Sequence, residues 1–237
     1  MEQPRLSIVV PVYNEERTLA ALIDRVFAAC PYAQVVFVND GSRDKSQEIL
    51  MAKARPQDVV LTKENGGKGS AVRMGYTRAT GKYVIVQDAD LEYDPSEING
   101  LLEYAESKNL PALFGSRRLK KQKQFVHLSF FVGGSLLTYI CNVLYHTRLT
   151  DQPTCYKMVR GDILKTFKMK ENDFRFDPEL TVLLARVPVP IAELPISYYP
   201  RTIEEGKKIN WKDWFRWVWV FVTYRFRSRA SFFVQSA

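Results

Sequence analysis

The sequence predicts an α/β fold in which a mostly parallel sheet is covered by helices on both faces. Along the first half of the chain, short apolar runs of strand length alternate with segments of helical periodicity, a pattern that builds consecutive βαβ units. Polar clusters follow three of the apolar runs, at residues 13–16, 39–42 and 88–92. Ligands of parallel sheets bind beyond the carboxyl ends of the strands, so we expect these clusters to converge on one crevice.

Length and composition fit one folded domain with an appendage. The chain has 237 residues, of which 46% are hydrophobic and 25% are charged, and these ordinary values exclude extensive disorder. We place the main domain at residues 1–210 and an aromatic, basic tail at residues 211–237. The net charge of +8 favours an anionic partner: a nucleic acid, a membrane surface or a phosphorylated substrate.

Cysteine and histidine usage indicates a reducing compartment and disfavours zinc. The cysteines are few, odd in number and without zinc-ligand spacing: Cys30, Cys141 and Cys155. Neither His127 nor His146 has a partner at metal-site spacing, which disfavours zinc chemistry and a Ser-His-Asp triad. The first residues run directly into an apolar strand with no visible signal peptide, so we expect a cytoplasmic location.

The first strand and the first helix follow from hydrophobic periodicity. Residues 6–10 form an apolar run that Pro11 and the polar residues 13–16 bring to an end. A helix is predicted next, because apolar side chains recur at helical spacing at Leu19, Leu22, Ile23, Val26 and Phe27.

Three further strands are predicted at residues 35–38, 58–61 and 82–87. Residues 39–42 supply turn and cap chemistry after the first of these. A glycine-rich stretch at residues 65–69 leads into a predicted helix at residues 70–79. Pro95 suits the first position of the following helix, where a missing N–H is tolerated.

Carboxylates follow the fourth strand at every second position, as Asp88, Asp90 and Glu92. In an extended backbone such side chains point to the same side, and grouped carboxylates are hard ligands for Mg²⁺ or Mn²⁺. The alternative is a simple turn, because aspartate is common where strands stop. The expected convergence with the clusters at residues 13–16 and 39–42 favours the metal site.

Composition changes after residue 116. Five basic side chains lie within residues 117–123, and an apolar segment follows at residues 125–145. With about 20 residues this segment is near membrane-spanning length, but four polar residues interrupt it: Ser129, Ser135, Thr138 and Asn142. We therefore favour a helix at a membrane interface or packed on the sheet over a spanning helix, and we interpret residues 117–150 as membrane-facing.

In the last third of the main domain, residues 151–159 predict a loop that enters a strand, and residues 175–179 predict the start of a helix. Residues 191–196 predict an edge strand. The tail is different, because all four tryptophans lie among basic residues within residues 211–229. Aromatic rings mixed with cations are typical of an interfacial membrane helix. Packing on its own domain and an oligomer interface are the alternatives, and the lack of a nucleic-acid-binding motif disfavours nucleic acid.

Two common phosphate-binding motifs are absent. A P-loop is excluded because Thr62 stands five positions before Gly67, and because Gly69 stands where a hydroxyl residue should follow Lys68. No glycines follow the first strand, which excludes a dinucleotide fingerprint. The glycine-rich entry to the helix still offers backbone N–H groups to an anion beside Lys68.

Four motifs occur in a defined order, at residues 9–15, 38–42, 65–69 and 88–90. Their order and spacing resemble the family 2 glycosyltransferases, which have the GT-A fold and use nucleotide-sugar donors. Later stretches resemble the polyprenyl-phosphate branch of that family, which includes dolichol-phosphate mannose synthase and dolichyl-phosphate glucosyltransferase: residues 115–117, Asp151, 154–157, 176–179, Arg201 and 205–208. The resemblance covers residues 6–212.

The resemblance implies a donor site. Pro11, Tyr13 and Glu15 would enclose the nucleotide base and ribose, and Asp40 would recognise the base. A further set of residues would bind the donor diphosphate, with Arg201 and one of the two later lysines closing over it: Lys68, Asp88, Ala89, Arg201, Lys207 and Lys208.

The resemblance also implies a metal and an acceptor site. Asp88 and Asp90 would hold Mg²⁺ or Mn²⁺ on the diphosphate, with Glu92 completing the shell, and Arg117 would meet the acceptor phosphate. Asp90, Asp151 and Arg117 would be the catalytic residues. Asn39 stands where an aspartate is common in the family. Glu92 stands where glutamine is common in the mannose synthases, and this second departure leaves the donor identity and the metal geometry open, but not the reaction type.

The expected reaction is transfer of one sugar, with inversion, from a UDP- or GDP-sugar to a polyprenyl phosphate, by a peripheral protein at the cytoplasmic face of a membrane. The prenyl phosphate is already anionic and needs no general base, so for Asp151 we favour a positioning role, with a loop cap as the alternative. Competing hypotheses are a glycosyltransferase acting on a saccharide or protein hydroxyl, a sugar nucleotidyltransferase, and a non-catalytic membrane-binding protein.

Overall fold

The computed structural model describes residues 3–120, 128–201 and 211–234. The expected diphosphate-binding residues Lys207 and Lys208 lie outside the described residues.

Within the described residues, seven strands form one sheet in the order β3-β2-β1-β4-β6-β5-β7. All neighbouring strands are parallel except β6, which runs antiparallel to β4 and β5. The mostly parallel α/β sheet is thus confirmed, and the strand with Pro195 lies at an edge as predicted. The strands are β1 (Leu6–Val12), β2 (Gln34–Asn39), β3 (Val59–Thr62), β4 (Tyr83–Val86), β5 (Ala112–Ser116), β6 (Lys157–Arg160) and β7 (Ile191–Pro195).

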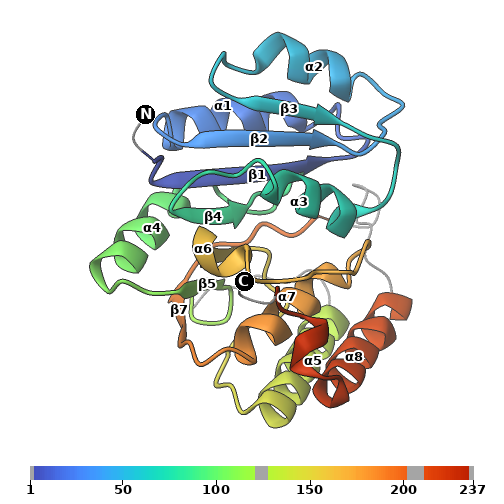
Figure 1. Cartoon of the computed structure of the whole chain (residues 1–237). Helices are drawn as coiled ribbons and strands as arrows, with labels where there is room; N and C mark the ends of the chain where they lie inside the picture. Colours follow the sequence, from blue (N-terminus) through green and yellow to red (C-terminus); the bar gives the residue numbers. More distant parts are fainter. Residues whose placement is uncertain (1–2, 121–127, 202–210, 235–237) are drawn as a thin grey trace.

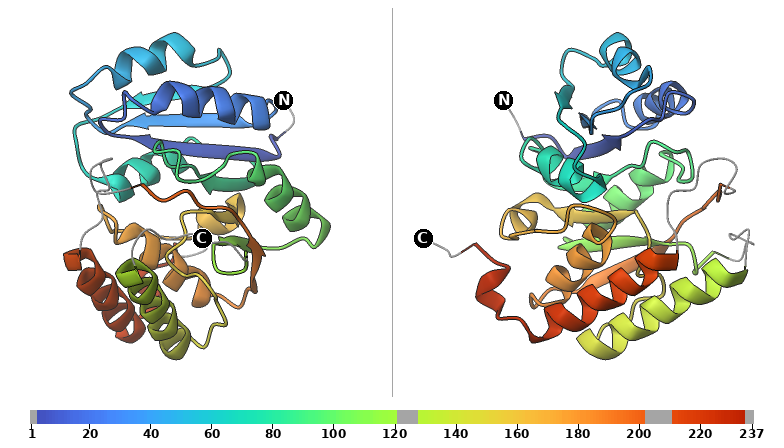
Figure 2. Two further views of the ribbon diagram at one scale, coloured as in Figure 1. Left: turned by 180° about the vertical axis from the view of Figure 1, so that it is seen from behind. Right: turned by 90° about the vertical axis from the view of Figure 1, so that its right-hand side faces the viewer.

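Helices cover both faces of the sheet (Figure 1). Figure 2 shows α1 and α2 on one face and α3 on the other. Helix α1 packs the four buried side chains of its apolar stripe against the sheet, which confirms the periodicity argument. The helices are α1 (Leu19–Ala29), α2 (Ser46–Lys53), α3 (Lys68–Tyr76), α4 (Glu97–Ser107), α5 (Leu128–Tyr145), α6 (Gly161–Leu164), α7 (Phe176–Ala185), α8 (Trp211–Phe226) and the 3₁₀ turn η1 (Arg229–Ser231).

Pro11 does not end the first strand, contrary to the expectation from sequence. Strand β1 continues to Val12, whose carbonyl accepts the Asp40 N–H at 2.8 Å. On the other side, pairing between β1 and β4 ends at Val9 opposite Val86. The missing N–H of Pro11 therefore removes no bond of the ladder, which is the situation in which a strand tolerates proline.

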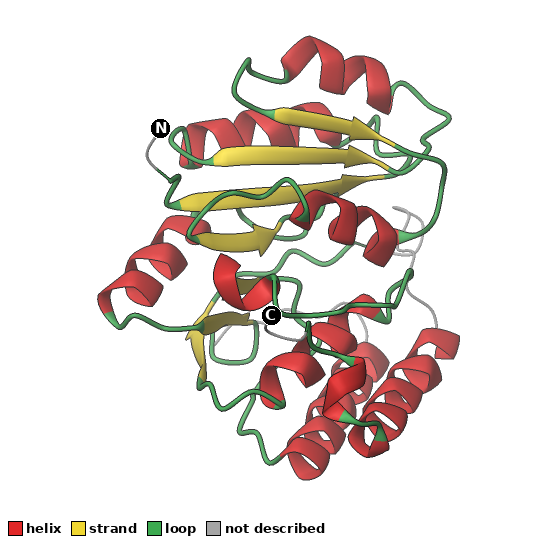
Figure 3. Ribbon diagram, in the orientation of Figure 1, coloured by secondary structure: helices red, strands yellow, loops and turns green. Residues whose placement is uncertain are grey.

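Helices α5 and α8 lie side by side below the sheet, and α8 also packs on α7 (Figure 3). The inner face of α8 is buried through Trp217, Val220, Phe221 and Tyr224. The Tyr145 hydroxyl of α5 donates to the Phe221 carbonyl at 2.7 Å. Packing of the tail helix on its own domain is therefore observed for this face.

The opposite faces of α5 and α8 expose large apolar side chains. We call this surface the outer apolar face, and it comprises Phe130, Phe131, Val132, Leu136, Tyr139 and Val143 of α5 with Phe215, Trp219, Val222 and Phe226 of α8. None of the described helices is both long and apolar enough to span a membrane.

Candidate active site

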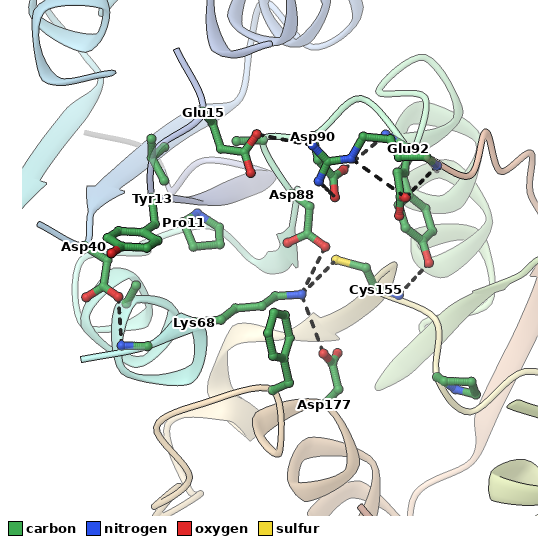
Figure 4. A pocket seen from close by; sticks show the side chains of 18 of the residues that line it. Pro11, Tyr13, Glu15, Asp40, Lys68, Asp88, Asp90, Glu92, Cys155 and Asp177 are labelled. Carbon is green, nitrogen blue, oxygen red and sulfur yellow. Dashed lines mark hydrogen bonds and ion pairs between the residues drawn. The ribbon is translucent and has the colours of Figure 1, made fainter. Parts of the chain in front are cut away.

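A pocket of about 340 Å³ lies at the carboxyl ends of the central strands (Figure 4). The three polar clusters converge there, as predicted. Among the expected site residues, eleven line this pocket: Pro11, Tyr13, Glu15, Asp40, Lys68, Asp88, Ala89, Asp90, Glu92, Arg117 and Arg201. The fold thus gathers residues from the first and last parts of the main domain into one site.

Reciprocal hydrogen bonds fix the loop after β1 against the loop after β2. Asn14, in a left-handed conformation (φ 52°), accepts the Arg43 N–H on its side chain at 2.8 Å. Its own N–H donates to the Ser42 hydroxyl at 3.0 Å. Two such links in opposite directions hold the loops as a unit, which fixes the position of Tyr13 at the pocket.

The Asp40 carboxylate fixes the glycine-rich loop at residues 65–69 against the loop after β2. Its two carboxylate oxygens accept the N–H groups of Gly66 and Gly67 at 2.9 and 2.8 Å, and Lys63 Nζ lies 2.7 Å from Oδ1. Gly41 has φ +72°, and a side-chain carbon on it would lie 2.7 Å from the Asn65 amide nitrogen, so only glycine fits. Asp40 therefore shapes the wall where the nucleotide base is expected.

The backbone after β4 turns, and the predicted extended carboxylate row is wrong. The strand ends at Val86, and Leu91 adopts a left-handed conformation with φ 63°. The Asp90 carboxylate accepts the N–H of Glu92 at 3.1 Å, which stabilises the turn. The two aspartates still border the pocket, because the turn rather than a strand directs them there.

Glu92 faces the segment after β7. Its carboxylate oxygens accept the Tyr198 hydroxyl and the Arg201 N–H, both at 2.8 Å. No group of three or more Asp, Glu, His or Cys side chains that could hold a metal occurs within the described ranges. Asp88 and Asp90 nevertheless offer two hard oxygen ligands in the pocket, a donor set that fits Mg²⁺ or Mn²⁺ when a diphosphate and water complete the shell.

Both aspartates face cationic side chains. Lys68 Nζ lies 3.0 Å from Asp88 Oδ2, and Arg201 Nη2 lies 3.1 Å from Asp90 Oδ2. Burial, with the charges of Asp88 and Glu92, raises the pKa of Asp90 to about 7, although Arg201 opposes this shift. The negative charge of Asp90 is therefore disfavoured at this point unless a cation or a proton offsets it.

Asp177, at the start of α7, is a pocket residue that the sequence analysis missed. It lies 3.6 Å from Lys68 Nζ and 3.2 Å from Lys157 Nζ. Burial alone would raise the pKa of Asp177, but the two lysines lower it below its ordinary value. Its only sequence signal was its place in the stretch 176–179, since the contact with Lys68 is tertiary.

Lys68 and Cys155 share this part of the pocket (Figure 4). Burial alone would lower the pKa of Lys68, but Asp177 and Asp88 raise it well above its ordinary value. Burial and the charge of Asp88 raise the pKa of the neighbouring Cys155 thiol. The lysine is therefore cationic and the thiol neutral at physiological pH.

Arg117 also lines the pocket, and Asp151 holds its side chain. The two side chains form a two-point ion pair, and the Arg117 guanidinium also lies over the Tyr198 ring at 4.9 Å. Asp151 is fully buried and is not among the lining residues. Glu193 of β7 fixes the Asp151 loop by accepting the N–H groups of Thr150 and Asp151.

Comparison with known families gives one match that covers most of the chain. The model of "Glycosyl transferase family 2" matches residues 7–167. Curated relatives include the undecaprenyl-phosphate 4-deoxy-4-formamido-L-arabinose transferases of Yersinia pestis (strain Pestoides F), 42% identical over 110 residues, and of Pectobacterium atrosepticum, 43% identical over 109 residues. The matched region is 43% and 42% of this chain and only 34% and 33% of these relatives, about a third of their length.

Solved structures share the fold at low sequence identity. The glucosyl-3-phosphoglycerate synthase of Mycobacterium tuberculosis, in complex with Mn²⁺, UDP and glucosyl-3-phosphoglycerate, has a TM-score of 0.67 at 15% identity, over 94% of this chain and 80% of that one. TarS of S. aureus in complex with UDP-GlcNAc has a TM-score of 0.56 at 17% identity, over 96% and 69%. These similarities confirm the GT-A fold.

Proposed function

The chain belongs to glycosyl transferase family 2, and we propose that it transfers one sugar, with inversion, from a UDP- or GDP-sugar to a polyprenyl phosphate at a membrane surface. The observation that carries this proposal is one pocket lined both by a carboxylate pair, Asp88 and Asp90, and by the fixed guanidinium of Arg117. This arrangement suits two anionic substrates that meet at a sugar. The curated relatives are named for transfer to undecaprenyl phosphate.

The donor occupies the side of the pocket formed by the loops after β1, β2 and β4. Pro11, Tyr13 and Glu15 bind the base and ribose, beside the wall that Asp40 holds in place. Ala89 borders the same side. The distant structural relatives bound to UDP and UDP-GlcNAc support a nucleotide there.

The diphosphate lies over Asp88 and Asp90, which would hold Mg²⁺ or Mn²⁺, and Glu92 would complete the metal shell. When bound, the divalent ion neutralises the charge that develops on the leaving diphosphate. Lys68 and Arg201 place two further cations at this end of the pocket. One of the two lysines Lys207 and Lys208 is proposed to join Arg201 at the diphosphate.

The acceptor phosphate binds Arg117. Its guanidinium is oriented by Asp151, whose two oxygens are both engaged by it, and such a carboxylate positions a group better than it removes a proton. Asp177 lies between two lysines that keep it a weak base. Both facts favour a phosphate acceptor, which is already anionic, over a hydroxyl acceptor, which needs a base.

The outer apolar face of α5 and α8 would bring the pocket to a lipid substrate. Apolar rings at headgroup depth, flanked by basic residues such as Arg225 and Arg227, are what an interfacial helix needs. We propose peripheral attachment at the cytoplasmic face of a membrane, through residues 117–150 and the tail.

A donor panel tests the proposal. The full chain is incubated with Mn²⁺ or Mg²⁺, one short prenyl phosphate and radiolabelled UDP- and GDP-sugars in turn, and the labelled lipid is extracted. We expect one sugar nucleotide to label the lipid. Labelling of a soluble saccharide, with none of the prenyl phosphate, would instead select the hydroxyl-acceptor alternative.

A further inference from the structure

Each aspartate of the metal-binding pair is neutralised by a cation from another element. Lys68 at the start of α3 pairs with Asp88 at 3.0 Å, and Arg201 after β7 pairs with Asp90 at 3.1 Å. Figure 4 shows Lys68 reaching into the pocket toward Asp88. A divalent ion that binds this pair must therefore compete with two protein cations.

Each cation also has a second carboxylate within reach. Lys68 Nζ lies 3.6 Å from Asp177 Oδ2, and Arg201 Nη1 lies 3.5 Å from Glu15 Oε2. Asp177 and Glu15 lie outside the aspartate segment, on α7 and after β1. Lys68 is thus shared between Asp88 and Asp177, and Arg201 is shared between Asp90, Glu15 and, at 3.9 Å, Glu92.

Asp177 is a fixed partner for Lys68. Its Oδ1 accepts a hydrogen bond from Lys157 Nζ at 3.2 Å, and the same ammonium donates to the Thr154 carbonyl at 2.7 Å. Asp177 and Lys157 are 6% and 2% exposed, so water cannot easily replace either partner. With Oδ1 engaged by Lys157, Oδ2 faces Lys68.

We propose that Asp177 is a positioning residue of the metal site: when a divalent ion binds Asp88 and Asp90, Lys68 transfers its ion pair from Asp88 to Asp177. The proposal rests on the proposed function only in requiring a divalent ion at the aspartate pair. Without Asp177, Lys68 would either stay on Asp88 and oppose the ion or be left as a buried charge with no partner, and both states are unfavourable. With Asp177, the ammonium remains in the pocket beside the donor diphosphate.

Mn²⁺ binding to the full chain at pH 8, measured by electron paramagnetic resonance without any sugar substrate, tests this transfer. Asp177→Asn should weaken Mn²⁺ binding about tenfold, within the range of coupling between contacting residues. Lys68→Met should bind Mn²⁺ at least as tightly as the unmodified chain, because Asp88 then has no competing cation. The double variant should recover the affinity that Asp177→Asn loses, since the lysine that needed Asp177 is gone.

Asp58→Asn is the matched control, because Asp58 is also an ion-paired, inaccessible carboxylate but partners Arg55 away from the pocket; its Mn²⁺ affinity should be unchanged. Two results would overturn the proposal and leave the proposed function intact. One is equal Mn²⁺ affinity of Asp177→Asn and the unmodified chain, and the other is weaker Mn²⁺ binding by Lys68→Met than by the unmodified chain. Absence of Mn²⁺ binding by the unmodified chain would overturn the proposed transfer of the ion pair, whereas the donor panel tests the proposed function separately. If Mn²⁺ affinities follow the expected pattern but no prenyl phosphate is glycosylated, only the proposed function fails.

Discussion

Arg117 and Asp151 form two parallel hydrogen bonds, from Nε to Oδ2 at 2.7 Å and from Nη2 to Oδ1 at 2.8 Å. The Arg117 N–H adds a third bond to Oδ2 at 2.8 Å. Asp151 is fully buried, whereas Arg117 borders the pocket. A planar guanidinium in this two-point geometry has a defined orientation, which a flexible ammonium cannot reproduce.

Replacing Arg117 by lysine should therefore affect the acceptor and spare the donor. We expect Arg117→Lys to raise the KM for prenyl phosphate about tenfold or more, through loss of oriented charge-assisted hydrogen bonds. The Kd for nucleotide, measured by calorimetry, should be unchanged. Arg5→Lys is the control, because Arg5 pairs with Glu106 at the surface. A loss of nucleotide affinity as large as the loss for the acceptor would place Arg117 in the donor site instead.

The same pair should make stability depend on pH. Burial alone would raise the pKa of Asp151, but Arg117 lowers it below its ordinary value. A carboxyl whose pKa is lower in the folded state stabilises the fold above the unfolded pKa of about 3.9, and this contribution is lost as the pH falls through the folded value. Asp151→Asn should thus lower the free energy of unfolding by about 3 kcal/mol at pH 7.

The difference in the free energy of unfolding between the unmodified chain and Asp151→Asn should become smaller below pH 4, because the carboxyl of Asp151 becomes protonated. Urea titrations from pH 7 to pH 3 measure it. A difference that stays constant over this range would mean that the charge of Asp151 does not stabilise the fold.

Asp90→Ala should abolish metal-dependent transfer and leave the fold intact. The Asp90 side chain lines the pocket, is 16% exposed and has Arg201 as its cationic partner, so its loss removes a metal ligand at the pocket wall without opening the apolar core. We expect activity to fall at least about a hundredfold, as metal stabilisation is worth several kcal/mol, with a nearly unchanged Tm. Asp162→Ala removes an exposed carboxylate paired with Arg160 and serves as the control. Full activity of Asp90→Ala would refute the metal site.

The convergence of the three polar clusters could be predicted from sequence, because parallel strands bring their carboxyl ends to one edge of the sheet. The local path of Asp88 to Glu92 could not. It depends on the left-handed conformation of Leu91 and on the hydrogen bond from the Glu92 N–H to Asp90. Alternating carboxylates fit a strand and a turn equally well.

Asp177 shows a second limit of sequence analysis. It reaches Lys68 because α7 packs against α3, far away in sequence, and no spacing rule relates the two positions. The tail shows a third limit. Its aromatic residues face both inward and outward, and only the structure separates buried Trp217 from exposed Trp219.

Exposed residues of the outer apolar face give the last prediction. Removing the whole tail would expose the core that Val220 and Phe221 fill, so single surface changes are the better test. Trp219 and Tyr139 are each 65% exposed on α8 and α5, and Met51 is 67% exposed on α2. We expect Trp219→Ser and Tyr139→Ser each to weaken sedimentation with anionic liposomes about tenfold. Burial of each aromatic side chain at a membrane contributes roughly 1.5–3 kcal/mol to binding, and the substitution removes this contribution. Met51→Ser should sediment like the unmodified chain. If all three variants sediment like the unmodified chain, α5 and α8 do not contact the membrane.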